Sequence, residues 1–117
     1  MAVSDVTIWH NPRCSKSRET LKLLEDRGIE PVIRLYLQDP PTADELRAMR
    51  GMLGVETLAM MRVKEAAFKE LNLSRDSEDE LLIAGMVAQP VLIERPVVIK
   101  NGKAAIGRPP ENVLAVL

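Results

Sequence analysis

The sequence predicts an α/β fold in which a βαβ unit comes first, a ββα unit comes last, and helices lie between them. Three observations support this prediction. Two β-rich runs, at residues 6–9 and 32–37, enclose a helical pattern. The middle of the chain has helical periodicity. Near the C-terminus, Asn101-Gly102, a strong signal for a two-residue hairpin, separates two further β-rich runs.

The stretch of residues 3–18 combines a strand, a tight turn, the one cysteine of the chain and a helix start. Residues 6–9 alternate as in a strand of a buried sheet. Pro12 cannot donate to a β-ladder and ends the strand. The helical pattern that follows ends at Gly28, a residue typical of the position after a helix C-terminus. Cys14 is therefore expected at the N-terminus of the first helix.

The second β-rich run, residues 32–37, predicts a strand parallel to the first, because a helix separates the two. Helical segments are expected to follow, beginning with a capping box at residues 42–45. Shorter helical pieces are expected at residues 56–61 and 65–71. A second capping box at residues 77–80 predicts another helix, whose expected buried stripe is Leu81, Leu82, Met86 and Val87.

The C-terminal part predicts a strand at residues 97–99, a returning strand at residues 103–106 and a last helix at residues 112–117. A βαβ half joined to a ββα half is the thioredoxin-like arrangement, and the middle helices form an insertion between the halves. Pro96 stands where that fold keeps a cis-proline facing a reactive cysteine. With 117 residues and no linker, residues 1–117 are predicted to form a single domain.

Composition excludes several classes of protein. The formal net charge is −1, which argues against a general nucleic-acid surface or an anionic-membrane surface. The chain shows no signal-peptide pattern and no apolar run long enough for a bilayer. A single cysteine allows no internal disulfide and no thiolate-rich metal site, so no metal is expected. These features predict a cytoplasmic protein in a reducing compartment.

Cys14 has two interpretations. A lone cysteine is often a small buried apolar residue. Here, however, Arg13, Lys16 and Arg18 are close in sequence, and both cations and a helix N-terminus lower the pKa of a thiol. The sequence therefore favours a reactive thiolate, a nucleophile, at this position.

The motifs around residues 10–18, 94–96 and 107–109 resemble those of the ArsC-type arsenate reductases, which draw electrons from glutathione and glutaredoxin. The likeness extends over nearly the whole chain, the helical insertion included. It implies that Cys14 attacks arsenate and that His10 helps to activate the thiol. The arginines that match the oxyanion-binding residues of the family are Arg62, Arg95 and Arg108.

The resemblance also implies partners and a cofactor requirement. Arsenate is the expected substrate, glutathione the co-substrate and glutaredoxin the partner that resolves the mixed species, with no bound cofactor. The absence of a second cysteine fits this scheme, because the resolving thiol must then come from another molecule.

Three alternatives to an arsenate reductase were compared with the sequence. A low-molecular-weight phosphatase loop requires arginine six residues after the cysteine, where this chain has Thr20. A regulator resembling Spx often carries a CxxC switch, but Ser17 and Asn11 stand where a second cysteine would lie. A thiol oxidoreductase of the same fold that does not use arsenate stays open.

Overall fold

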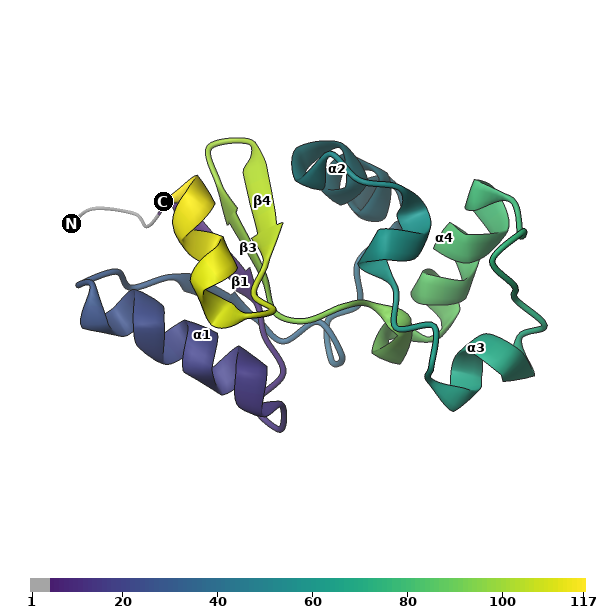
Figure 1. The fold of residues 1–117 in the computed structure, drawn as a ribbon, viewed down its shortest axis with the longest axis horizontal. Coiled ribbons are helices and arrows are strands. Elements are labelled where there is room, and N and C mark those ends of the chain that lie inside the picture. The colour runs from purple at the N-terminus through teal and green to yellow at the C-terminus, as the bar shows by residue number, and fades with distance from the viewer. Residues whose placement is uncertain (1–4) are drawn as a thin grey trace. The chain divides into compact units, whose positions relative to one another are not determined.

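The computed structural model describes residues 5–117, so Val3 and Ser4 of the first predicted stretch lie outside the described residues. The chain divides into two compact units (Figure 1). The first consists of the described residues up to Asp39 together with Arg95–Leu117, and the second is Pro40–Glu94. The interpretation of residues 1–117 as one domain stays a prediction.

The first unit contains a four-stranded sheet in the order β2-β1-β3-β4. Strand β1 pairs in parallel with β2, whereas β3 pairs antiparallel with both β1 and β4. The strands are β1 (Val6–Trp9), β2 (Val32–Arg34), β3 (Val97–Lys100) and β4 (Lys103–Ile106). A βαβ half and a ββα half thus share one sheet, and the predicted thioredoxin-like fold is confirmed.

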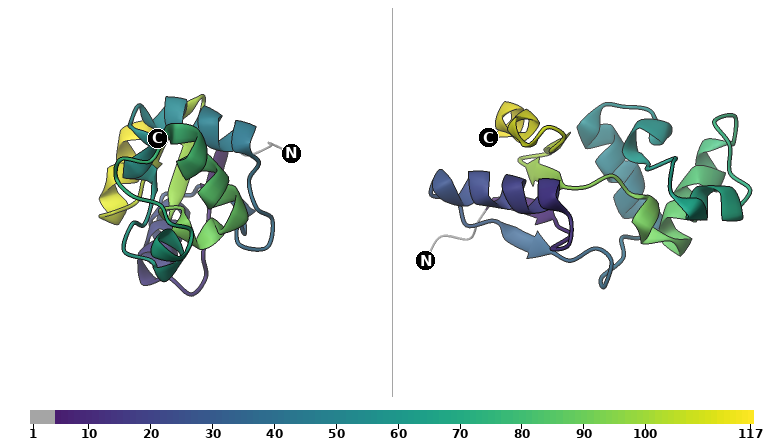
Figure 2. Two further views of the ribbon diagram at one scale, coloured as in Figure 1. Left: turned by 90° about the vertical axis from the view of Figure 1, so that its right-hand side faces the viewer. Right: turned by 60° about the horizontal axis from the view of Figure 1, so that its bottom comes forward.

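Helices α1 (Ser15–Asp26) and η3 (Pro110–Val116) complete the first unit. They lie side by side in Figures 1 and 2 and share one apolar core with the sheet. The buried residues of that core are Val6, Ile8, Leu24, Val98 and Val113. Because β1 and α1 both contribute to it, the loop that joins them is held at both ends.

One detail of this unit agrees with the prediction from sequence, and another does not. The hairpin is confirmed, since Asn101 and Gly102 both have positive φ values, 50° and 76°, as the turn requires. Strand β2 is shorter than predicted and ends at Arg34. After that residue the chain turns, and the carbonyl of Leu35 accepts hydrogen bonds from the N–H groups of Gln38 and Asp39.

The second unit is helical and corresponds to the predicted insertion. It contains α2 (Ala43–Leu53), η1 (Thr57–Met60), α3 (Ala66–Glu70), α4 (Asp79–Ala88) and η2 (Pro90–Leu92). The capping box of α2 is confirmed: Thr42 Oγ1 accepts from the N–H of Glu45, and the Glu45 side chain accepts from the N–H of Thr42.

The second predicted capping box is wrong. Helix α4 begins after Glu78, which makes no side-chain cap, and Ser77 Oγ instead accepts a hydrogen bond from the N–H of Ser74 at 2.9 Å. The predicted stripe is also only half right, because Leu81 and Val87 are 57% and 38% exposed. The buried residues of α4 are Leu82, Ile83, Gly85 and Met86.

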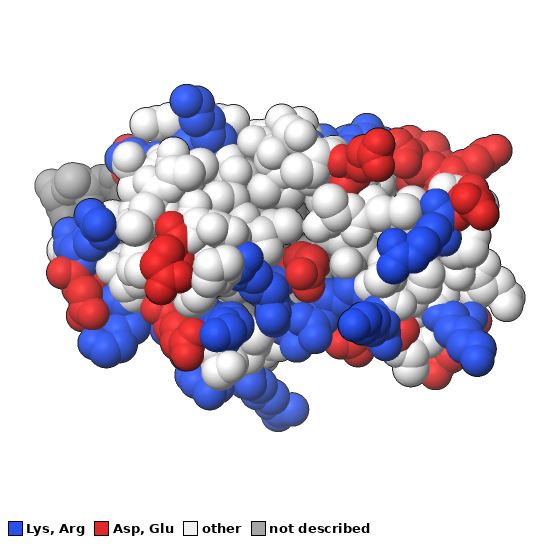
Figure 3. Space-filling model, viewed as in Figure 1, with Lys and Arg blue, Asp and Glu red and all other residues white. Residues whose placement is uncertain are grey.

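The surface carries both signs of charge. Figure 3 shows Lys and Arg interspersed with Asp and Glu over the first unit, and Asp and Glu gathered at one end of the second. Within residues 5–117, no helix has the length and apolar character needed to cross a membrane.

Gly107, just after β4, is expected to be essential for packing. A Cβ at this position would lie 2.6 Å from Thr20 Oγ1 and 2.8 Å from Pro96 Cγ, and neither the buried threonine nor the proline ring can move away easily. Gly107→Ala should therefore lower the free energy of unfolding by about 1–3 kcal/mol, measured by urea denaturation.

Gly51→Ala is the matched control. Gly51 lies inside α2 with no atom within 4 Å of the added Cβ, so the substitution should raise stability by about 0.5–1 kcal/mol. Equal stability of the two variants would contradict the packing role of Gly107.

Candidate active site

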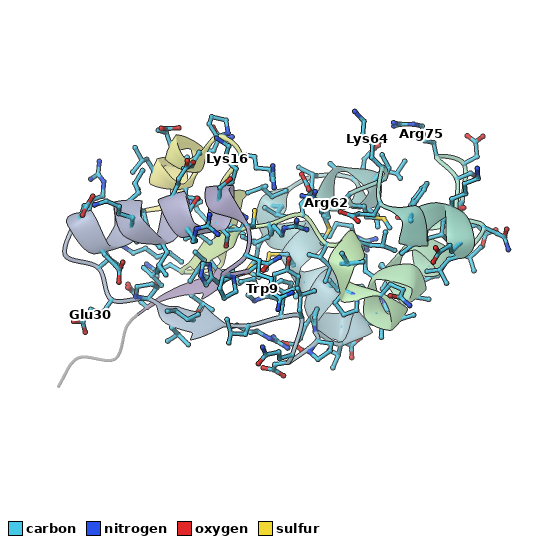
Figure 4. All side chains as sticks on the ribbon, turned by 90° about the horizontal axis from the view of Figure 1, so that it is seen from below. Trp9, Lys16, Glu30, Arg62, Lys64 and Arg75 are labelled. Carbon is cyan, nitrogen blue, oxygen red and sulfur yellow. The ribbon has the colours of Figure 1, made fainter. Side chains whose placement is uncertain are left out.

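Cys14 occupies the N-cap position of α1, as predicted. Its backbone is extended, with φ −96° and ψ 122°, and its carbonyl accepts the N–H of Arg18 at 3.0 Å. The Cys14 N–H donates to the carbonyl of Asn11 at 3.0 Å, which closes the tight turn after β1. The side chain is 8% exposed and points its sulfur at the first N–H groups of the helix. Figure 4 labels Trp9 and Lys16, which lie on the two elements joined by this turn.

The register of the sheet explains why distant residues meet the turn. Trp9, the last residue of β1, pairs with Val97 at the start of β3, and Val97 pairs with Ile106 at the end of β4. The segments just outside these three positions therefore lie at one edge of the sheet. Those segments carry Cys14, Arg95 and Arg108.

Arg108 contacts the cysteine directly. Its Nη2 donates to Cys14 Sγ at 3.4 Å, across 94 residues of sequence, while its Nε donates to the carbonyl of Arg95 at 2.9 Å. The peptide bonds Arg95–Pro96 and Arg108–Pro109 are both cis, and the first stands at the position expected from the fold.

Arg95 supplies a second guanidinium to the same sulfur. Its side chain hydrogen-bonds Cys14 and also interacts with Tyr36, which is fully buried. The Nε and Nη1 atoms of Arg95 are buried and have no acceptor among residues 5–117. Buried donors of a charged group are costly to leave unpaired, so these two atoms would be stabilised by a bound anion.

These contacts determine the acidity of the thiol. Burial alone raises the pKa of Cys14, but hydrogen bonds from the N–H of Ser17, the Arg95 guanidinium and the N–H of Lys16 outweigh it, so that the pKa lies below its ordinary value. The predicted direction and the predicted role of the helix N-terminus agree with this, whereas the cation at the sulfur is Arg95 and not Arg13, Lys16 or Arg18. Arg18 instead donates to the carbonyl of Pro12.

His10 lies at the end of β1 and is 6% exposed. Its backbone N–H donates to the carbonyl of Arg34, and its ring Nδ1 lies 2.6 Å from Ser17 Oγ. Burial, and secondly the charge of Arg18, lower the pKa of His10. The structure thus places His10 beside the first turn of α1, linked to it through Ser17.

Arg62 belongs to the second unit, so it is described separately from Cys14. Its Nε donates to Glu65 at 3.0 Å and its Nη1 to Glu94 at 3.5 Å, and its backbone N–H donates to Leu92. The side chain, labelled in Figure 4, is 24% exposed. The structure therefore brings Arg95 and Arg108 to Cys14, and the oxyanion-binding role of Arg62 stays a prediction.

Sequence reasoning missed two residues of the site. Ser17 lies on the same helical face as Leu21 and Leu24, and a polar residue on such an apolar stripe is a signal for a buried hydrogen bond. Tyr36 falls within the predicted strand at residues 32–37, which gives no sign of a contact with Arg95. No group of three or more His, Cys, Asp or Glu residues in the described part of the chain could hold a metal ion.

Together these residues place a thiol of lowered pKa beside two guanidinium groups. A thiolate is a strong nucleophile, and guanidinium groups bind tetrahedral oxyanions through paired, charge-assisted hydrogen bonds. The arrangement can therefore hold an oxyanion next to the sulfur that attacks it.

Comparison with known proteins gives consistent results. The sequence model of the ArsC family matches residues 9–116. The chain is 54% identical to "Uncharacterized protein YfgD" of Escherichia coli K12, over 96% of each chain. It is 49% identical to an arsenate reductase of Haemophilus influenzae, over 96% of this chain and 98% of that protein. The solved structure of an arsenate reductase from Vibrio cholerae has a TM-score of 0.95 and 51% identity, and covers 99% of this chain and 100% of its own.

The pH dependence of Cys14 alkylation by iodoacetamide should report the lowered pKa, with a midpoint below about 8.5. Arg95→Ala and Arg108→Ala should each raise that midpoint by about one pH unit or more, because each removes a cation that contacts the sulfur. Arg13→Ala is the control, since Arg13 is exposed and is not among the groups that lower the pKa of Cys14. A wild-type midpoint at or above 8.5 would contradict the site as described.

The lowered pKa of Cys14 should also make the free energy of unfolding rise with pH. The folded pKa of Cys14 lies below the unfolded value, so between the two values only the unfolded chain binds the proton and stability rises with pH. The free energy of unfolding of wild type minus that of Cys14→Ser should therefore increase with pH and level off above about 8.5. As the pH is lowered, this difference should decrease between the unfolded and the folded pKa and stay constant below the folded pKa, which urea denaturation at several pH values would show.

Proposed function

Because the chain belongs to the ArsC family, we propose that it is an arsenate reductase whose Cys14 thiolate forms the bond to arsenic. The observation that carries this proposal is the contact of the Cys14 sulfur with the guanidinium groups of Arg95 and Arg108 within one unit. Full-length relatives that bear the name arsenate reductase support the choice of substrate.

Binding of arsenate is assigned to the arginines. At neutral pH arsenate is a tetrahedral anion with about two negative charges, which matches planar, always-charged guanidinium groups. Two buried nitrogens of Arg95 lack an acceptor among the described residues, and we assign them to oxygen atoms of the anion. Arg62 is proposed as the third arginine on the strength of its match to the family, and its ion pairs with Glu65 and Glu94 would then hold the guanidinium in place.

The chemical step begins with attack of the Cys14 sulfur on As(V). A sulfur–arsenic bond forms, and one oxygen leaves as water after taking up protons. His10 is proposed to support this step from its place beside the first turn of α1. Arg95 and Arg108 stabilise the charge of the remaining arsenic oxygens and of the thiolate before attack.

Completion of the reaction requires external thiols, because the chain has one cysteine. Glutathione is proposed to displace a second oxygen as water and form its own bond to arsenic. A glutaredoxin thiolate then attacks the glutathione sulfur, and the electron pair of the broken bond reduces As(V) to As(III). One mixed disulfide forms per two electrons, and hydrolysis of the remaining sulfur–arsenic bond releases arsenite. No bound cofactor is needed, and the demand for reduced thiols fits the cytoplasm.

The proposal predicts arsenate-dependent oxidation of NADPH in the presence of glutathione, glutathione reductase and glutaredoxin. Cys14→Ser should abolish it, because a serine hydroxyl is not ionised at this pH. Arg95→Lys should lower kcat/KM roughly tenfold or more, since an ammonium cannot make the paired hydrogen bonds of a guanidinium. A single hydrogen bond to a charged group contributes about 1.5–3 kcal/mol.

Arg13→Lys is the matched control for the arginine substitution, because this exposed arginine adjoins Cys14 in sequence and should keep wild-type activity. NADPH oxidation that proceeds equally without arsenate would instead identify a general thiol oxidoreductase. Arsenate-dependent activity that needs glutathione but not glutaredoxin would reject only the resolving step.

A further inference from the structure

We propose that Ser17 is a positioning residue that joins His10 to Cys14 and holds the imidazole as the neutral tautomer protonated at Nε2. The inference rests on the proposed function for its catalytic meaning, since Cys14 is the nucleophile of that reaction. The hydrogen bonds themselves exist without any substrate and can be tested without one.

Ser17 makes two side-chain hydrogen bonds although the residue is 0% exposed. Its Oγ lies 2.6 Å from His10 Nδ1 and accepts the N–H of Asn11 at 3.0 Å, and the Asn11 carbonyl in turn accepts the N–H of Cys14 at 3.0 Å. The backbone N–H of Ser17 also lowers the pKa of the Cys14 thiol. One buried residue thus links the end of β1 to the tight turn that carries the nucleophile. Loss of its hydroxyl would leave both Nδ1 of His10 and the N–H of Asn11 without their described partner.

The pattern of donors fixes the tautomer. Ser17 Oγ already accepts one N–H, and its single hydrogen must be donated to some acceptor. Among residues 5–117, the hydrogen-bond partner of Ser17 Oγ that can accept this hydrogen is His10 Nδ1, at 2.6 Å. Nδ1 is therefore unprotonated and the ring hydrogen lies on Nε2. A hydrogen on Nδ1 would force the buried hydroxyl to give up its acceptor.

The charged groups around the pair favour the same state. Arg18, on the same helix, acts on His10, and burial disfavours the imidazolium more strongly still. The cations that face the Cys14 sulfur are Arg95 and Arg108, from the segments before β3 and after β4. The thiolate therefore has its positive partners in the arginines, and His10 acts on it through Ser17 by orienting the N–H of residue 17 toward the sulfur.

The first test uses the wild-type protein, in which His10 is the one histidine. Two-bond ¹⁵N–¹H correlation spectra of the labelled chain at pH 7 should show a protonated Nε2 and an unprotonated Nδ1. A spectrum of the Nδ1–H tautomer, or of an imidazolium, would overturn the assignment.

The second test compares Ser17→Ala with Ser17→Thr and Thr20→Val. Ser17→Ala should give a mixture of tautomers and should raise the midpoint of Cys14 alkylation by about one pH unit, which is a roughly tenfold decrease in the ratio of thiolate to thiol at a given pH. Ser17→Thr, which retains the hydroxyl, should keep the Nε2–H tautomer. Thr20→Val removes a buried hydroxyl that donates to the carbonyl of Lys16, and should leave both readouts unchanged.

An unchanged alkylation midpoint in Ser17→Ala would overturn the link to Cys14. An equal shift in Thr20→Val would also overturn it, because the effect would then be general loosening of α1. Failure of the proposed function is distinguishable from these results: the tautomer and the alkylation midpoint would stand as expected, while NADPH oxidation would not respond to arsenate.

Discussion

The candidate active site depends on the compensation of the charge that a buried sulfur carries when it ionises. Water stabilises an ordinary thiolate, but Cys14 is 8% exposed and must find other donors. The backbone N–H groups of Lys16 and Ser17 and the guanidinium groups of Arg95 and Arg108 supply them. Each donor comes from a residue whose place is fixed by packing: the first two by the start of α1, the others by the ends of β3 and β4.

The local half of this arrangement was predictable from sequence. A short apolar strand, a turn with Pro12 and the helical pattern that ends at Gly28 place Cys14 at a helix N-terminus. The hairpin at Asn101-Gly102 was equally clear, because both residues tolerate positive φ. These signals are written in neighbouring residues and need no knowledge of the tertiary fold.

The positions of the two guanidinium groups could not be predicted without knowledge of how the strands pair in the sheet. Arg13 and Lys16 were the obvious cations in sequence, yet the guanidinium groups at the sulfur belong to residues that strand register brings from the other end of the chain. Arg95 and Arg108 entered through family resemblance and not through spacing. The capping box predicted at residues 77–80 was wrong for a local reason. A serine hydroxyl can accept a hydrogen bond from the backbone of a preceding turn or from that of a following helix, and Ser77 Oγ accepts the N–H of Ser74 instead of capping α4.

The separation between Cys14 and Arg108 has a consequence for the life of the chain before it folds. Synthesis proceeds from the N-terminus, so Cys14 is made before Arg108, the guanidinium partner 94 residues further along the chain. Until Arg95 and Arg108 have been made and the sheet has formed, the sulfur lacks both guanidinium groups. Their share in lowering the pKa of the thiol therefore arises only when this part of the chain folds.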